Sequence, residues 1–246
     1  MKTATDKTVA SIVIQYPAAI PLFEGLKIDY CCGGQKPLGD ACAAVGVPVE
    51  KVLASLEKIS AASTSAQDQN WAERSLAELI EFLVEKHHTF TRGQLALLEK
   101  LSEKVARVHG QNHPELLDLR KLFQRMSADL QCHLMKEEQM AFPYLLELEK
   151  SKKTGIEDDS LFPFEAFQSQ PLRVLMADHE EVGKQLREAR RLTADFTPPE
   201  GACVTFQAFY KAFLELEEDL HRHIHLENNV LFPMAEKLAG DMVASL

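Results

Sequence analysis

Two stretches of the chain share a pattern in which apolar residues recur every three or four positions and are interrupted by one histidine and one glutamate. The interrupting pair is His133 and Glu137 in the first stretch and His223 and Glu227 in the second. The apolar positions of the two rows are Leu116, Leu119, Phe123, Met126, Leu130, Met140 and Tyr144, and Phe209, Phe213, Leu216, Leu220, Val230 and Met234. Such rows are typical of the core-facing seams of bundle helices. A glutamate in such a seam loses most of its hydration and persists only if it is paired or bound to a cation.

One further histidine precedes each pair at a similar distance. His179 lies 44 residues before His223, and His88 lies 45 residues before His133. His179 falls in the apolar row Leu172, Leu175, Val182, Leu186 and Ala189. His88 falls in the row Val84, Thr91, Leu95 and Leu98, and its neighbour His87 in the rival row Leu83, Phe90, Gln94 and Leu97. We favour His88 by a small margin, because its row matches that of the second half better.

These patterns predict an all-α four-helix bundle whose helices contribute His, His-x-x-x-Glu, His and His-x-x-x-Glu. The predicted metal ligands are His88, His133, Glu137, His179, His223 and Glu227. Four imidazoles and two carboxylates suit two metal ions bridged by the carboxylates, and mixed N/O ligation favours iron or manganese over structural zinc. A single histidine on a seam is usually a hydrogen-bonded core residue, but six ligand-type residues in register favour a site. His221 and His225 lie about 200° away from the seam, so we expect them to be solvated or, at most, to support a ligand.

The bundle helices are expected to begin near Trp71, Pro114 and Pro171, with the fourth following the Pro-Pro segment at 197–201. A short turn at 110–113 makes the first two helices antiparallel neighbours. Pro143 and Pro233 follow the two glutamates by six residues, and either kink the helices or mark their ends. Arg92, one turn after His88, either orients a ligand or a bridging carboxylate, or lies on a solvated face.

The first 62 residues read as a small helical domain, separated from a bundle domain at 71–246 by a polar linker at 60–70. Pro17 and Pro48 stand where helices of this domain could begin. Between its helices lies Asp-Tyr-Cys-Cys-Gly-Gly, in which Cys31 and Cys32 are adjacent and two glycines allow a turn with positive φ that exposes the thiols. The pair is either a redox-active or metal-transferring thiol site or two small residues packed in a loop. Cys42, Cys132 and Cys203 are expected to be ordinary buried residues.

Charge and composition narrow the class of function. The formal net charge of −10 argues against a nucleic-acid partner, which requires basic patches. The apolar runs are too short to span a membrane, and no secretory signal is evident. Five cysteines, an odd number, favour the reducing cytoplasm.

Together, the Cys31-Cys32 motif and the repeated His-x-x-x-Glu bundle resemble the repair of iron centres family, the YtfE/ScdA type of hemerythrin-like di-iron proteins. The resemblance covers nearly the whole chain. It implies a hemerythrin-like bundle with two non-haem iron ions per chain, held by the same six residues, and it leaves an oxo bridge between the ions open. The family's His-x-x-x-Arg pattern matches His88 and Arg92, which supports His88 over His87.

The resemblance also implies a function. The protein would repair iron–sulfur clusters damaged by oxidative or nitrosative stress, by donating iron to the damaged client proteins, with Cys31 and Cys32 in redox chemistry or iron transfer. The alternatives are an enzyme that binds or reduces NO and a hemerythrin-like O₂ or redox sensor. A homodimer joined through the Cys-Cys domain is left open.

Overall fold

The computed structural model describes residues 4–62, 71, 74–155 and 163–243. In these residues every regular element is a helix, so the predicted all-α fold is confirmed. Backbone contacts group residues 80–220 into one compact unit, and residues 1–79 with 221–246 into another. Most of the expected linker at 60–70 lies outside the described residues, and the domain limits 1–62 and 71–246 stay a prediction.

The N-terminal residues form short helices around their own apolar core. The elements are η1 (Ala4–Asp6), α1 (Val9–Gln15), η2 (Pro17–Ala19), α2 (Ile20–Leu26), α3 (Leu38–Ala44) and α4 (Val49–Ala62). Pro17 opens η2 and Pro48 precedes α4, as expected of a residue whose φ is already helical and which has no N–H to leave unpaired. The core contains Val9, Ile12, Val13, Ala19, Phe23, Ile28, Tyr30, Leu38, Ala41, Cys42 and Val52.

The loop that carries the adjacent cysteines depends on a glycine for a different reason from the one expected. The positive-φ glycines in the described residues are Gly46, Gly155 and Gly201, so the predicted positive φ at Gly33 or Gly34 is wrong. A Cβ on Gly34 would lie 2.5 Å from the Tyr30 carbonyl oxygen and 2.9 Å from Cβ of Ala10. Glycine is therefore required because the loop packs closely against α1 and its own backbone.

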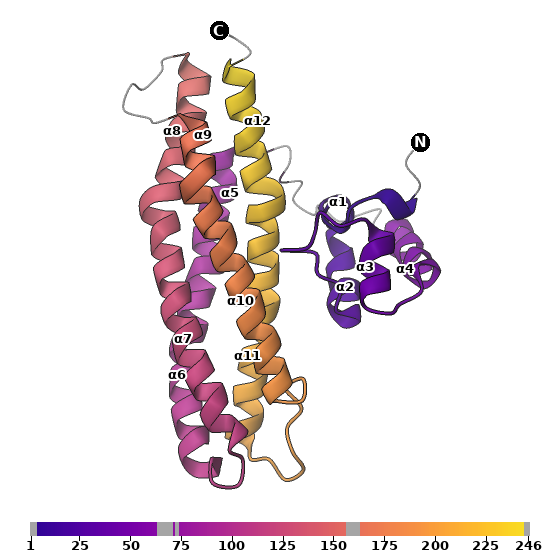
Figure 1. The fold of residues 1–246 in the computed structure, drawn as a ribbon, viewed down its shortest axis with the longest axis vertical. Helices are drawn as coiled ribbons and strands as arrows, with labels where there is room; N and C mark the ends of the chain where they lie inside the picture. Colours follow the sequence, from indigo (N-terminus) through magenta and orange to yellow (C-terminus); the bar gives the residue numbers. More distant parts are fainter. Residues whose placement is uncertain (1–3, 63–70, 72–73, 156–162, 244–246) are drawn as a thin grey trace. The chain divides into compact units, whose positions relative to one another are not determined.

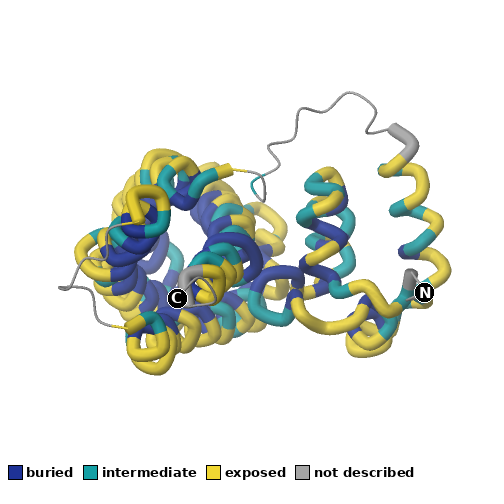
Figure 2. The backbone as a smooth tube through the Cα atoms, turned by 90° about the horizontal axis from the view of Figure 1, so that it is seen from above, coloured by how far each residue is buried: buried dark blue, intermediate teal, exposed yellow. Residues whose placement is uncertain are grey.

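Four long helical stretches follow, each joined from shorter elements without a gap. They are α5 (Leu76–Phe82), η4 (Leu83–His88) and α6 (Thr89–His109); α7 (Glu115–Lys136), η5 (Glu137–Ala141) and α8 (Phe142–Thr154); α9 (Phe164–Phe167), η6 (Gln168–Leu172) and α10 (Arg173–Leu192); and α11 (Val204–Leu226), η7 (Glu227–Leu231) and α12 (Phe232–Val243). The long helices α6, α7, α10 and α11 run beside one another (Figure 1). Seen from above, buried backbone faces the inside of the helical group and exposed backbone faces outward (Figure 2).

The predicted seams form the core of the bundle. Its buried residues include Leu95, Leu98, Leu116, Leu119, Phe123, Met126, Leu130, Val182, Leu186, Ala189, Phe209, Phe213, Leu216 and Leu220. Phe213 makes edge-on contact with Phe123 and stacks on Phe196. The apolar period of the sequence therefore places α6, α7, α10 and α11 as predicted.

Each long helix contains one π-helical turn, a feature that the sequence pattern did not predict. Neither Pro143 nor Pro233 ends its helix: each lies two residues after a π-helical turn, in a helix that continues. A π-helical turn contains one residue more than an α-helical turn, so the apolar face advances by one position after it. The expectation that Met140 continues the seam is therefore wrong. Met140 is 61% exposed, whereas Ala141 is 1% exposed.

Two predicted helix starts also need correction. The first bundle helix begins at Leu76 rather than near Trp71, and the third begins at Phe164 rather than at Pro171. Pro171 lies inside η6, one of the π-helical turns, where a helix can accommodate a residue without an N–H. The turn at 110–113 is confirmed. There a Cβ on Gly110 would lie 2.4 Å from the Ala106 carbonyl oxygen, so only glycine fits.

Of the three cysteines expected to be buried, only Cys42 is. Cys132 and Cys203 are exposed, because they lie on the outer side of α7 and just before α11 rather than on a seam. In the described part of the chain, no helix is both long and apolar enough to cross a membrane.

Candidate metal centre

The first bundle helix brings two buried histidines into different surroundings. His88 is 0% exposed, and its Nε2 lies 3.4 Å from Oε2 of Glu137. His87 is also buried, but its Nδ1 lies 3.0 Å from Oδ1 of Asp219. The side chain of His88, the preferred candidate, therefore faces Glu137, another predicted ligand. The side chain of His87 faces Asp219, which is not a predicted ligand.

The second and third helices place three more of the predicted residues together. Nε2 of His133 lies 3.0 Å from Oε1 of Glu137 and 3.0 Å from Nε2 of His179. Glu137 is 0% exposed and is the first residue of η5. Its carboxylate thus lies among three imidazoles, those of His88, His133 and His179.

The fourth helix repeats this arrangement with His223 and Glu227. Both are buried, and Nε2 of His223 lies 3.0 Å from Oε1 of Glu227. Glu227 is the first residue of η7, as Glu137 is of η5. Because α11 is continuous from Val204 to Leu226, His223 extends the same helical face as Leu216 and Leu220.

The six residues fall into two groups with potential ligand atoms within 4.8 Å of one another. One group is His88, Glu137, His223 and Glu227, and the other is His133, Glu137, His179 and Glu227. All members are buried, and the two glutamates belong to both groups. Two neighbouring cations that share two carboxylates would account for this arrangement.

Hydrogen bonds on the far side of two imidazoles determine which atoms face the centre. Nδ1 of His88 lies 2.7 Å from Oε1 of Glu138, and Nδ1 of His133 lies 3.2 Å from Oδ2 of Asp178. An ionised carboxylate only accepts hydrogen bonds, so each Nδ1 carries a hydrogen, and each ring in its neutral form presents its Nε2 lone pair to Glu137. Converging lone pairs and carboxylate oxygens repel one another unless protons or a cation neutralise them. The donor set therefore fits a bound cation.

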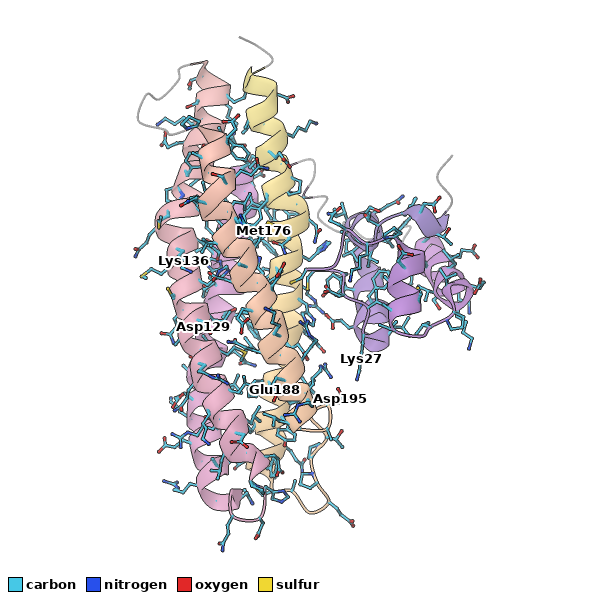
Figure 3. All side chains as sticks on the ribbon, in the orientation of Figure 1. Lys27, Asp129, Lys136, Met176, Glu188 and Asp195 are labelled. Carbon is cyan, nitrogen blue, oxygen red and sulfur yellow. The ribbon has the colours of Figure 1, made fainter. Side chains whose placement is uncertain are left out.

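The two supporting carboxylates are themselves held by cations on the outer side of the bundle. Glu138 accepts two hydrogen bonds of 2.9 Å from Nη2 of Arg92, and Asp178 accepts one of 2.7 Å from Nζ of Lys136. Lys136 and Asp129 of α7 are labelled in Figure 3. Arg92 does not contact either predicted bridging carboxylate in the described residues: its side chain is 48% exposed, and it pairs with Glu138, which in turn bonds His88.

The charge state of both carboxylates follows from these contacts. Burial disfavours ionisation of Glu138, but the hydrogen bonds from His88 and Arg92 outweigh it and lower its pKa. The hydrogen bond from His133 lowers the pKa of Asp178 to about 2, and Lys136 adds to this effect. Sequence reasoning missed Asp178, and its position directly before His179 was the available signal. A carboxylate on the distal nitrogen of a histidine ligand fixes the ring and raises its basicity.

His221 and His225 were expected to be solvated or, at most, to support a ligand, and solvation is wrong for His225. His225 is 3% exposed, and its Nδ1 lies 3.1 Å from the carbonyl oxygen of Tyr30. Burial lowers its pKa to about 4. His221 is partly exposed, with its Nδ1 2.9 Å from Oε1 of Glu24. The N-terminal residues cover a helix face that the sequence pattern showed only as polar.

The adjacent cysteines lie in this covering segment. Cys31 is 6% exposed, Cys32 is half-buried, and the two are thiols rather than a disulfide, with 3.9 Å between their Sγ atoms. Sγ of Cys31 also lies 3.4 Å from Oδ1 of Asp29. The hydrogen bond with Cys32 and burial raise the pKa of Cys31 well above its usual value. The predicted exposure of both thiols is therefore wrong for Cys31.

Comparison with known proteins agrees with this picture. Residues 78–235 match the hemerythrin HHE cation binding domain, and residues 5–60 match ScdA_N, a domain of unknown function. Proteins named iron-sulfur cluster repair protein YtfE from Yersinia pseudotuberculosis serotype IB (strain PB1/+) and Yersinia pestis (strain Pestoides F) are 34% identical to this chain over 230 residues. The match covers 94% of this chain and 96% of each relative. The chain therefore belongs to the hemerythrin HHE cation-binding family and, within it, to the YtfE type of iron–sulfur cluster repair protein.

Proposed function

We propose that this protein repairs damaged iron–sulfur clusters by supplying iron held as a pair of ions between Glu137 and Glu227. One observation carries the proposal: two buried groups of histidines share both glutamates. The proposed ligands are His88, His133, Glu137, His179, His223 and Glu227. The relatives are named for the repair of iron–sulfur clusters, and this function requires client proteins with damaged clusters.

The ligand set suits iron that can be released. The six proposed ligands carry only two negative charges, so they compensate less than half of the charge of two ferric ions. Reduction to the ferrous state further weakens the attraction between the ions and the carboxylates. Imidazole nitrogens and bridging carboxylates would hold the cargo, and the carboxylates Glu138 and Asp178 would keep His88 and His133 oriented to receive it.

Iron transfer to a damaged client tests the proposal. Iron-loaded protein is mixed with a dehydratase whose cluster has been damaged by peroxide, and recovery of dehydratase activity is followed against free ferrous iron at the same concentration. We expect the loaded protein to restore activity in the presence of a chelator that blocks repair by free iron. The Glu137→Gln variant, treated in the same way, should restore none. Absence of recovery with the loaded protein would contradict the proposal.

Reduction of NO is a second candidate function, favoured by the number of ligands. Each group offers an ion two imidazoles and two carboxylates, which leaves positions open on an iron ion that prefers about six ligands. A small molecule such as NO or O₂ could then bind. Catalytic formation of N₂O from NO in the presence of a reductant, without any recovery of damaged clients, would favour this function.

Location and assembly remain proposals. All five cysteines are thiols, which supports the reducing cytoplasm as the compartment. A homodimer through the Cys-Cys domain is testable by light scattering at several protein concentrations, in which a dimer gives twice the mass of the 27.6 kDa chain.

A further inference from the structure

The fourth helix has a second face that is occupied by protein rather than by water. His221, His225 and Asn229 follow one another at intervals of four residues, so their side chains share one side of the helix. The proposed ligands His223 and Glu227 are offset from this row by two positions, about 200° around the helix. We call the row of His221, His225 and Asn229 the docking face. Each of its members contacts a residue between Glu24 and Gln35.

Asn229 makes the most specific of these contacts. Its Nδ2 donates to the carbonyl oxygens of Cys31, at 3.0 Å, and Tyr30, at 3.4 Å. Its Oδ1 accepts a hydrogen bond of 2.9 Å from Nε2 of Gln35. These three hydrogen bonds are directed at the thiol loop, which we define as residues 29–34, and at Gln35 directly after it. Nδ2 of Asn229 also lies 3.3 Å from Nδ1 of His225 on the same helix. Asn229 is 7% exposed, so breaking these bonds would remove three hydrogen bonds from a buried amide.

A second group of contacts holds the same loop from its other side. The hydroxyl of Tyr30 donates to Oε1 of Glu24 at 2.8 Å, and Nδ1 of His221 lies 2.9 Å from the same oxygen. The ring of Tyr30 packs edge-on against the ring of His225, with 5.5 Å between centroids. Tyr30 is 1% exposed, so the aromatic ring anchors the loop and Asn229 fixes its backbone.

The loop anchor and a proposed metal ligand lie in the same π-helical turn. Glu227 opens η7, its carbonyl oxygen accepts the backbone N–H of Phe232, and Asn229 lies between them. A shift of this turn therefore moves the Glu227 carboxylate and the Asn229 amide together. Interactions that each depend on one conformation of a shared element are coupled, and the coupling is reciprocal.

We propose that Asn229 is a positioning residue that holds the Cys31-Cys32 loop on the helix carrying Glu227, so that metal binding and thiol accessibility depend on each other. With metal bound, η7 is fixed, Asn229 retains the loop, and the Cys31 thiol stays buried. When the metal leaves, η7 relaxes, the loop opens, and Cys31 becomes accessible. The inference rests on the proposed metal centre but not on any repair activity.

Alkylation of individual cysteines by iodoacetamide, followed by peptide mass spectrometry, tests this proposal on the full chain. Cys42, buried in the N-terminal core, is an internal control, because its alkylation rises only if that core opens. Glu218→Ala, a change on the exposed side of α11, is the matched control variant. The protein is compared after loading with ferrous iron and after treatment with a chelator. No client is present, so a failure of Asn229 to hold the thiol loop is distinguishable from a failure of cluster repair.

We expect Asn229→Ala to raise the alkylation rate of Cys31 about tenfold in the iron-loaded protein, with Cys42 unchanged, because two hydrogen bonds to the loop are lost. In the unsubstituted protein, removal of iron should raise the Cys31 rate about threefold or more, and in Asn229→Ala it should add nothing further. Equal Cys31 rates in Asn229→Ala and the unsubstituted protein, or no effect of iron on the unsubstituted protein, would overturn the proposal.

A second variant covers the case in which Asn229→Ala opens the N-terminal core and Cys42 reacts as well. Gln35→Ala removes an exposed side chain and leaves the helix unchanged, so that the Asn229 amide loses only its orienting bond. We expect a rise of about threefold in the Cys31 rate, again with Cys42 unchanged. No rise in this variant would overturn the proposal.

Discussion

At the scale of single residues, Glu137 lies in an unfavourable position for a charged side chain. It is 0% exposed and its carboxylate faces three imidazoles, so the charge must be neutralised in place. Glu217 is almost as buried, at 3% exposed, but it forms a 2.6 Å ion pair with Arg190. Two buried glutamates in one bundle thus differ in what neutralises them, which makes them a natural pair for comparison.

The first prediction uses this pair. Glu137→Gln should abolish most iron binding and leave the metal-free protein as stable as before or more stable, because a buried charge is removed. Glu217→Gln should retain the iron and lower the free energy of unfolding by about 2 kcal/mol, because Arg190 loses its buried partner. Metal analysis and urea unfolding of both variants measure these effects. Iron loss in Glu217→Gln but not in Glu137→Gln would be the contrary result.

The second prediction concerns the carboxylates behind the histidines. Asp178→Asn weakens the support of His133, and Arg92→Ala leaves Glu138 without its cation. Either change should weaken iron binding by about 10- to 100-fold while the number of irons at saturation stays the same. Competition with a chelator of known affinity gives the binding constant. Arg191→Ala, which removes an exposed Arg–Glu pair on α10, is the control and should leave iron affinity unchanged.

The six proposed ligands could be predicted from the sequence because they interrupt apolar rows. The structure places them in two groups that share both glutamates. The role of Asp178 could not be predicted, because it depends on which neighbouring helix carries His133. The burial of His225 could not be predicted for a related reason: the carbonyl oxygen of Tyr30 that covers it is nearly 200 residues away in sequence. Periodicity reveals which side of a helix is apolar, but not what packs against a polar side.

At the scale of elements, the π-helical turns determine how the proposed ligands and the core fit together. η5 begins at Glu137, and directly after it the ring of Phe142 stacks on the ring of His88, with centroids 5.6 Å apart. The extra residue in the turn brings Phe142 to this position, and Met140 is exposed as a result. Apolar periodicity predicted the helices on both sides of the turn. The shift between them was missed because one extra residue is too small a change to detect in a period of 3.6.

The third prediction is that deletion of Met140 should be far more damaging than its substitution. Deletion converts η5 toward an α-helical turn and rotates Phe142 and the following core residues out of register, which should cost several kcal/mol, about 3 or more, and lower the iron content. Met140→Ala changes a side chain that is 61% exposed and should shift stability by less than about 0.5 kcal/mol. Urea unfolding distinguishes the two, and similar losses in both variants would contradict this explanation of the turn.

At the scale of the whole molecule, bound metal should contribute directly to stability. The free energy of a ligand that binds only the folded state adds to the free energy of unfolding, about 2.7 kcal/mol at a hundredfold excess over the dissociation constant. The fold class, four long helices and the seams were predictable because apolar burial dominates them. The limits of helices near Trp71 and Pro171 were not, because helix ends depend on local packing and on the π-helical turn at Pro171.

The fourth prediction follows from this contribution. Saturation with ferrous iron should raise the melting temperature by about 5–10 °C, and a chelator should reverse the rise. Differential scanning calorimetry without oxygen measures it, with His223→Ala as the variant in which the shift should shrink. An equal shift in His223→Ala would place the stabilising ions elsewhere.

The most direct test of the account is the metal content of the protein, determined together with its optical spectrum after expression with iron and removal of loosely bound metal. We predict about two irons per chain, absorption in the near ultraviolet from the ferric centre, and loss of both in Glu137→Gln. A folded, metal-free protein that takes up no iron, or one whose iron is unaffected by Glu137→Gln, would contradict the claim that these buried histidines and glutamates are gathered around metal.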